Sequence, residues 1–212
     1  LPDLPRTIYP LMPESDNFEC ETLQMQWNTI HPPIEPIYSL TERFGYLRLY
    51  TREEVMNEIC LPSFVGRRQR HKVFLARTAM EFTPAAENEE AGIALVQDDR
   101  FHYLMVLTQK NGKLVLQAYK TENGIKSLLT ETEVRDTKRI YLSVQGNTTD
   151  YDFYYGHNDQ EMIPLIRGLK ASLLSSVINN GFTGTYIGMY TSSNHHSSTN
   201  HADFDWFNYQ GE

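Results

Sequence analysis

The chain has 212 residues, of which 40% are hydrophobic and 22% are charged, and this balance is typical of a globular protein rather than a disordered one. Its 19 Lys and Arg against 27 Asp and Glu give a net charge of −8, which argues against a nucleic-acid binder because such proteins normally present a basic face. No apolar run approaches the roughly 18 residues of a membrane span. From the charge and the apolar runs together, we expect neither a nucleic acid nor a membrane as a partner.

The beginning of the chain is rich in proline. Seven of the ten prolines lie within residues 1–36. Because proline lacks a backbone donor and resists both helices and central strands, we interpret residues 1–14 as the remnant of a linker and residues 15–212 as the folded domain. The sequence begins with Leu1 rather than Met, and a linker at its start predicts that another domain precedes it. We therefore expect this chain to be a piece of a longer protein.

Beyond Tyr38, short runs alternate between apolar and polar residues and are separated by Gly, Asn and Asp. In one run, Ile140, Leu142 and Val144 point to the same face. The runs cover residues 46–50, 74–82, 93–96, 103–108, 113–119, 139–145, 151–155, 186–190 and 204–209. Their number and spacing predict an all-β fold, an antiparallel two-sheet β-sandwich. Only residues 165–178 show a helical spacing, weakened by Gly168, so we expect a short helix or an irregular loop there.

The acidic residues do not define a catalytic pair. Hydrolysis by two carboxylic acids needs side chains held about 5 to 9.5 Å apart. The acidic residues here, such as Asp98, Asp99, Glu131 and Glu133, lie in expected turns or on polar strand faces, where they are expected to be solvated. No nucleophile elbow, phosphate-binding loop or dinucleotide fingerprint occurs. The sequence therefore identifies no catalytic residue.

A basic cluster interrupts this acidic chain at residues 64–71, Phe-Val-Gly-Arg-Arg-Gln-Arg-His. Arg67, Arg68 and Arg70 carry planar guanidinium groups, which hold carboxylates or hydroxyl groups through paired donors. We therefore consider Arg67 and Arg68 candidates for a substrate pocket or a domain interface. The alternative is a polar strand face held by salt bridges.

A glycine-rich segment follows at residues 181–188, Gly-Phe-Thr-Gly-Thr-Tyr-Ile-Gly. Its three glycines allow tight turning and display Phe182 and Tyr186. An exposed aromatic ring on such a loop suits stacking on a sugar or docking against a partner. The alternative is that one of the two rings packs in the core.

Carboxylates near the two ends of the domain are candidate calcium ligands. Asp16 lies near the start, and Asp203 and Asp205 lie near the end. The first and last strands of a sandwich are often neighbours, so these side chains can meet, and calcium prefers carboxylate oxygens in loops. The alternative is that Asp203 and Asp205 face solvent while Phe204 and Trp206 face the core.

Taken in order, these segments resemble the C-terminal β-sandwich domain of family 43 glycoside hydrolases, the β-xylosidase and α-arabinofuranosidase group. The resemblance covers nearly all of the chain from about Pro13 onward. It runs through Asp16-Asn-Phe18, Leu23, Trp27, Ser39-Leu-Thr41, Gly45–Tyr50, Phe64–Arg68, Phe82-Thr-Pro84, Ala91-Gly92, Gly181–Gly184 and Ala202–Phe207. It implies a concanavalin A-like jelly roll, preceded by a catalytic five-bladed propeller whose carboxylates perform inverting hydrolysis of xylose- or arabinose-type oligosaccharides.

The resemblance also implies roles for particular residues. In some family members a sandwich loop helps to close the sugar pocket, and Phe182 and Tyr186 match it. The family sandwich can hold a structural calcium ion, and Asp16 and Asp205, with Asp203 as a lesser candidate, match its ligands. The Ser-, Asn- and His-rich segment 191–201 departs from the family pattern. It follows the pocket-closing motif and can alter how the domain meets its propeller.

These observations favour a non-catalytic accessory domain that packs on a catalytic propeller and shapes its active-site entrance. The parent chain is then a glycoside hydrolase, although this piece is not expected to be catalytic by itself. Two alternatives stay open: an independent carbohydrate-binding module, and a complete lectin-like hydrolase with its own acid pair.

Overall fold

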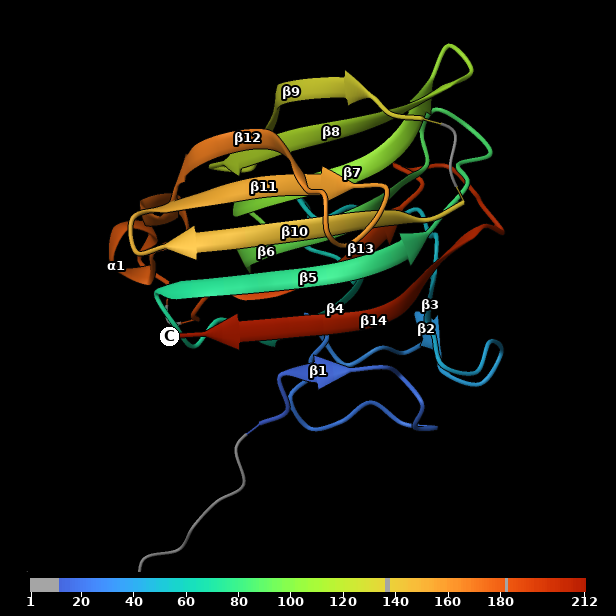
Figure 1. Cartoon of the computed structure of the whole chain (residues 1–212), viewed down its shortest axis with the longest axis horizontal. Helices are drawn as coiled ribbons and strands as arrows, with labels where there is room; N and C mark the ends of the chain where they lie inside the picture. Colours follow the sequence, from blue (N-terminus) through green and yellow to red (C-terminus); the bar gives the residue numbers. More distant parts are fainter. Residues whose placement is uncertain (1–11, 136–137, 182) are drawn as a thin grey trace, which may run out of the picture.

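The computed structural model describes residues 12–135, 138–181 and 183–212 of the chain. Its regular structure is almost entirely β, arranged as two facing antiparallel sheets (Figure 1). The predicted antiparallel sandwich is therefore confirmed. The linker predicted over residues 1–14 lies largely outside the described residues.

The two sheets differ in size and contain 14 strands in the described ranges. The eight-stranded sheet has the order β12 (Ile163–Lys170), β11 (Asp150–Gly156), β10 (Ile140–Asn147), β5 (Val73–Glu81), β14 (His201–Gly211), β3 (Leu47–Tyr50) and β2 (Tyr38–Ser39), with β1 (Ser15–Asp16) paired to β14. The six-stranded sheet has the order β4 (Ser63–Arg68), β13 (Tyr186–Ser192), β6 (Glu90–Asp98), β7 (Phe101–Lys110), β8 (Lys113–Glu122) and β9 (Ile125–Glu133). Every pairing is antiparallel, as hairpin connections favour.

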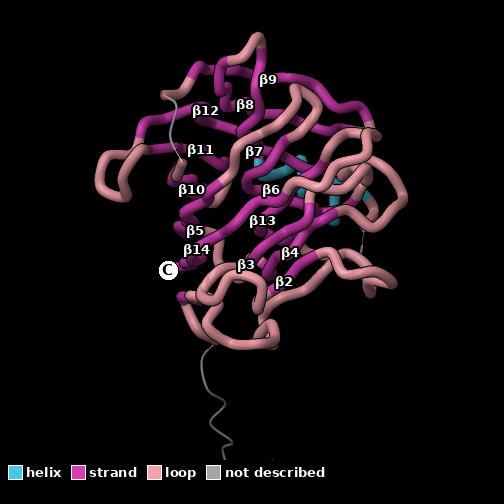
Figure 2. The backbone as a smooth tube through the Cα atoms, turned by 90° about the vertical axis from the view of Figure 1, so that its right-hand side faces the viewer, coloured by secondary structure: helices cyan, strands magenta, loops and turns pink. Residues whose placement is uncertain are grey.

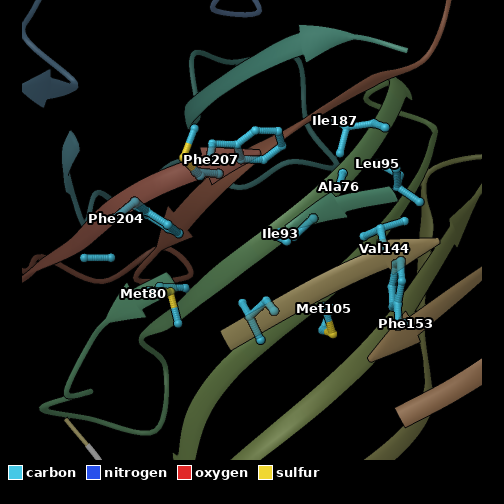
Figure 3. Packing of buried hydrophobic residues seen from close by; sticks show 14 of the residues in the cluster. Ala76, Met80, Ile93, Leu95, Met105, Val144, Phe153, Ile187, Phe204 and Phe207 are labelled. Carbon is cyan, nitrogen blue, oxygen red and sulfur yellow. The ribbon is translucent and has the colours of Figure 1, made fainter. Parts of the chain in front are cut away.

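The main core lies between the sheets and is built from alternate residues of each strand. On β10 the predicted inward residues Ile140, Leu142 and Val144 are all at most 1% exposed. Figure 3 shows side chains of the two sheets meeting in this layer, with Phe204 of β14 and Ile93 of β6 among them. Burying each such side chain stabilises the fold by roughly 1.5 to 3 kcal/mol.

Strands β9 and β12 are among the strands that the alternating runs do not predict. Strand β9 lies at a sheet edge and is mostly exposed, so it lacks an alternating apolar pattern. The expectation of a helix or loop at residues 165–178 is wrong in its first half, because β12 pairs with β11 there through an irregular register. Only a 3₁₀ turn (Ala171–Leu174) and the single α-helical turn α1 (Ser176–Asn179) follow, and the helical segments occupy one small region in Figure 2. Within the described ranges, no helix is long and apolar enough to cross a membrane.

A β-bulge changes the orientation of residues along β14. Phe204 pairs with Met80, whereas Trp206, two residues later, pairs with the adjacent Ala79. This register shift turns Phe204 and Phe207 into the core, where each is 0% exposed. Trp206 instead faces outward and lies 6.4 Å from the Tyr141 ring, centroid to centroid. The alternative in which Phe204 and Trp206 both face the core is therefore right for Phe204 and wrong for Trp206, because strict alternation does not continue through a bulge.

The bulge predicts unequal costs for truncating two adjacent aromatic residues. Phe207→Ala should lower the free energy of unfolding by about 3 to 5 kcal/mol, because it removes a fully buried ring. Trp206→Ala should cost much less, because the outward ring remains partly solvated. Urea unfolding of the two variants measures the difference, and equal losses would contradict the register described here.

Candidate functional site

The predicted residues Tyr186 and Arg68 meet on the outer face of the six-stranded sheet. They are cross-strand neighbours on β13 and β4. Arg68 Nη2 donates a hydrogen bond of 3.2 Å to the Tyr186 hydroxyl, and the guanidinium carbon lies 5.2 Å from the ring centroid. A cation–π contact of this kind contributes about 0.5 to 1 kcal/mol at an exposed site. The pair therefore presents an oriented aromatic ring at the surface.

The glycines of this region act by permitting close approach rather than tight turning. None of Gly181, Gly184 and Gly188 has a positive φ angle. A Cβ on Gly188 would overlap the Val65 carbonyl and the backbone of Gly66 on the adjacent strand. Strands β13 and β4 therefore need glycine where they approach most closely, and this approach fixes Tyr186 against Arg68.

Strand alternation separates Arg67 from Arg68. Arg67 points to the opposite face and is only 2% exposed. Its Nη1 donates to the Pro13 carbonyl over 2.9 Å, and its guanidinium carbon lies 4.9 Å from the centroid of the Tyr209 ring. Burial lowers the pKa of Arg67, since Nε and Nη2 have no partner among the described residues. The structure thus places Arg67 where the chain enters the sandwich, away from Tyr186.

Phe182, the other predicted aromatic residue, lies outside the described residues. The segment on either side of it is attached to the end of β6. Thr183 Oγ1 donates to the Gln97 carbonyl over 3.1 Å, and the Gln97 side chain lies against Gly181. These contacts connect the glycine-rich segment to the cavity described next.

A cavity of about 320 Å³ opens beside Tyr186. Apolar side chains form much of its wall, and some belong to a second apolar cluster on the outer face of the six-stranded sheet. Its lining comprises Asn28, Thr29, Ile30, His31, Met56, Glu58, Ile59, Cys60, Pro62, Phe64, Val96, Gln97, Asp98, Asp99, Thr183 and Tyr186.

Sequence reasoning did not assign the segments 28–31 and 58–62 that help to form this cavity. Their apolar residues follow neither the two-residue alternation of a strand nor the spacing of a helix. A backbone bridge between Asn28 and Gly66 places the first of them beside β4. Such a contact depends on the folded arrangement, so no local pattern in the sequence indicates it.

The predicted proximity of the first and last strands is confirmed, since β1 pairs with β14 and Asp16 faces Phe207 in register. The carboxylate of Asp16 nevertheless has its own donors. It accepts a hydrogen bond of 2.9 Å from the backbone N–H of Phe18 and one of 2.6 Å from Trp27 Nε1. Asp205 instead pairs with Arg139 at 2.8 Å. The structure therefore holds these two carboxylates through different partners.

Asp203 belongs to an ion-pair network on the outer face of the eight-stranded sheet. It lies in register between Arg48 on β3 and Glu81 on β5. Arg48 donates hydrogen bonds to both carboxylate oxygens of Asp203. Arg43 Nη1 donates a hydrogen bond of 2.8 Å to Asp203 and another of 2.8 Å to Glu81. Burial acts to raise the pKa of Asp203, but the hydrogen bonds from Arg48 and Arg43 outweigh it and hold the pKa below its usual value. The carboxylate therefore stays ionised.

These arrangements do not fit one calcium ion shared by Asp16, Asp203 and Asp205. Each carboxylate has separate donors, and an ion shared by Asp16 and Asp205 would compete with Trp27 and Arg139. In the described part of the chain, no group of three or more His, Cys, Asp and Glu side chains is placed to hold a metal ion. Calcium binding stays a prediction from the resemblance.

Two further buried carboxylates stabilise the fold locally. Glu89 accepts hydrogen bonds from Ser198 and Asn200, which anchor the unusual segment 191–201. Burial acts to raise the pKa of Glu89, but these hydrogen bonds lower it overall. Glu90 pairs with Lys126 at 2.9 Å and accepts from Tyr190. A general acid needs a raised pKa, which the environment of Glu89 opposes.

Comparison with known proteins gives a consistent result over nearly the whole chain. Residues 15–210 match the family model described as "Beta xylosidase C-terminal Concanavalin A-like domain". A non-reducing end α-L-arabinofuranosidase of Bacteroides ovatus is 35% identical over 213 residues, covering 99% of this chain and 39% of its own length. A β-xylosidase of Bacillus subtilis is 29% identical and is covered over 40% of its length.

Solved structures agree with this match. The Bacteroides ovatus protein titled "Xyloglucan PUL GH43B" superimposes with a TM-score of 0.92 over 100% of this chain and 42% of its own. A xylan β-1,4-xylosidase of Bacillus halodurans superimposes with a TM-score of 0.91 at 29% sequence identity. The match covers 41% of its chain. The chain thus spans about two fifths of the length of these relatives.

The calcium hypothesis has a direct test in thermal unfolding. If Asp16 and Asp205 bind calcium, EDTA should lower the melting temperature and added calcium should restore it, because a ligand that binds only the folded state stabilises it. Asp205→Asn should abolish the response. An unchanged melting temperature, which the present hydrogen bonding favours, would remove the hypothesis.

The ion-pair network predicts a defined pH dependence. Because the folded-state pKa values of Asp203 and Glu81 are lowered, their contribution to stability is present above the unfolded values of about 4 and is lost as the pH falls through the folded values. Asp203→Asn should lower the free energy of unfolding at pH 7 by about 2 to 3 kcal/mol, and by less in acid.

Urea unfolding from neutral to acidic pH measures this effect. Glu133→Gln is the matched control, because Glu133 forms an exposed pair with Lys113 at the other sheet. If the loss of unfolding free energy in Asp203→Asn is as large in acid as at pH 7, the stabilising role assigned to the ionised Asp203 carboxylate is contradicted.

Proposed function

Because the chain belongs to the family of β-xylosidase C-terminal concanavalin A-like domains, we propose that it is a non-catalytic accessory domain. It packs against a catalytic propeller of the family 43 glycoside hydrolases and shapes the entrance to its sugar pocket. The observation that carries this proposal is the extent of the match, which covers about two fifths of relatives whose names state glycosidase activity. The remaining three fifths leave room for the catalytic domain.

The chemistry of the described carboxylates supports a non-catalytic role. Acid-catalysed sugar hydrolysis needs one carboxylic acid that stays protonated near neutral pH and a second carboxylate across the bond. The buried Asp16, Glu89, Glu90 and Asp203 each accept hydrogen bonds from groups that also fix strands or loops. Recruiting them for catalysis would cost those contacts.

The Tyr186–Arg68 pair is the surface that we assign to the pocket entrance. Tyr186 belongs to the glycine-rich segment and lies beside the cavity. An oriented ring offers apolar area at a small entropic cost, and it excludes water where a sugar or a partner packs on it. The relatives' names favour arabinofuranosides and xylosides as the substrate class of the parent enzyme.

A second function, an independent carbohydrate-binding module, is favoured by a different observation. Tyr141 and Trp206 present neighbouring rings on the outer face of the eight-stranded sheet, with centroids 6.4 Å apart and planes inclined by 46°. The small Ala79 lies in register between them. Paired aromatic rings on a sheet face provide stacking area for sugar rings.

The proposals separate in a set of kinetic and binding measurements. With the catalytic domain attached, Tyr186→Ala should lower kcat/KM on a nitrophenyl arabinofuranoside or xyloside about tenfold, equivalent to about 1.4 kcal/mol. Tyr186→Phe should retain most activity because the ring remains. Tyr154→Ala, on the other sheet, is the matched control and should have no effect.

The chain alone should hydrolyse neither substrate. Turnover by the chain alone would instead support a complete hydrolase. Tight binding of xylo- or arabino-oligosaccharides by the chain alone in calorimetry, lost in Trp206→Ala, would favour the carbohydrate-binding module.

A further inference from the structure

The cavity beside Tyr186 combines an apolar floor with an acidic rim. Met56, Phe64 and Val96 are at most 4% exposed and form its floor. Three carboxylates line it: Glu58, Asp98 and Asp99. None of the described lining residues is Lys or Arg. The cavity therefore places carboxylates next to a water-excluding surface.

Two of the three carboxylates are available for a partner. Asp98 is occupied, because it accepts from the backbone of Arg100 and Phe101 and pairs with the Arg100 side chain at 3.3 Å. Glu58 is half exposed and faces only His195, which is cationic only when protonated. Asp99 makes no hydrogen bond or ion pair with the residues that the structure describes. The open acceptors are therefore Glu58 and Asp99.

The mouth of the cavity also exposes apolar area. Ile59 is 91% exposed and Ile30 is 36% exposed, and both line the cavity. Apolar side chains held out in solvent beside a hollow indicate a surface that another molecule covers. An apolar floor with free carboxylates at its rim complements a long cationic side chain, whose methylene stem packs while its head stays at the polar edge. A neutral sugar would leave both carboxylate charges uncompensated.

We propose that this cavity receives an arginine or lysine side chain of the catalytic domain, with its stem on Phe64 and Val96 and its charged head between Glu58 and Asp99. A cavity of about 320 Å³ has the size of a small ligand pocket. This inference rests on the proposed function, since it names the chemistry by which the accessory domain recognises its catalytic partner. Arg is the better fit because its planar fork can bind two carboxylates at once.

The test compares the melting temperature of the sandwich in the chain alone with that of the chain joined to its catalytic domain. Docking should raise the melting temperature in the joined protein, and high salt should reduce the gain because it screens the pairing. The double variant Glu58→Gln/Asp99→Asn should reduce the gain by about 2 to 4 °C. In the chain alone the same variant should melt like the unaltered chain, which shows that the fold is intact.

The control is Glu133→Gln, an exposed carboxylate on β9 at the opposite edge of the six-stranded sheet, which should leave the gain unchanged. No gain on joining the domains would overturn the proposed function itself. If neither the double variant nor high salt changes the gain in melting temperature, only the cavity inference is overturned. A rise in the melting temperature of the chain alone with xylotriose or arabinotriose, lost in the double variant, would overturn it in favour of a sugar site.

Discussion

The position of β14 in the middle of the eight-stranded sheet is the constraint on which most of the structure depends. This last strand pairs with β5 along one edge and with β3 and β1 along the other, so it joins the end of the chain to its beginning. Its bulge sends Phe204 and Phe207 into the core and leaves Asp203, Asp205 and Trp206 outside. One strand thus determines both the packing between the sheets and the charge pattern on the outer face.

That charge pattern explains why Asp203 and Asp205, two of the candidate metal ligands, are held as ion pairs. Asp203 and Glu81 lie directly opposite each other, and like charges in such a pair repel. Arg43 donates to both, and Arg48 holds Asp203 from the other side, which turns a repulsive pair into a stabilising network. A carboxylate as buried as Asp203 would otherwise cost several kcal/mol. Arg43 and Arg48 supply the compensating charge that this buried carboxylate needs.

Sequence patterns predicted the parts of the fold that depend on local alternation. Alternate residues of a single strand point to the same face, so the shared burial of Ile140, Leu142 and Val144 follows from local sequence alone. The sandwich is predicted because many strands show this pattern. The bulge at Asp205 and the pairing of Asp203 with Arg43 and Arg48, 160 and 155 residues away in the chain, depend on register between distant strands. The edge strand β9 lacks a buried face and therefore a signal. In the candidate site, Tyr186 and Arg68 were identifiable as unusual residues, but their contact and the cavity required the fold.

The six-stranded sheet carries apolar side chains on both of its faces. Its inner face builds the main core, and its outer face carries a second apolar cluster that includes Phe64, Val96 and Tyr190. A sheet that is apolar on both faces must be covered twice. Loop residues such as Met56 cover much of the outer face, but the cavity and the exposed Ile59 mark where the cover is incomplete. Gly66 and Gly188 let β4 and β13 approach closely beneath this region, so the surface that we propose for docking rests on two tightly paired strands.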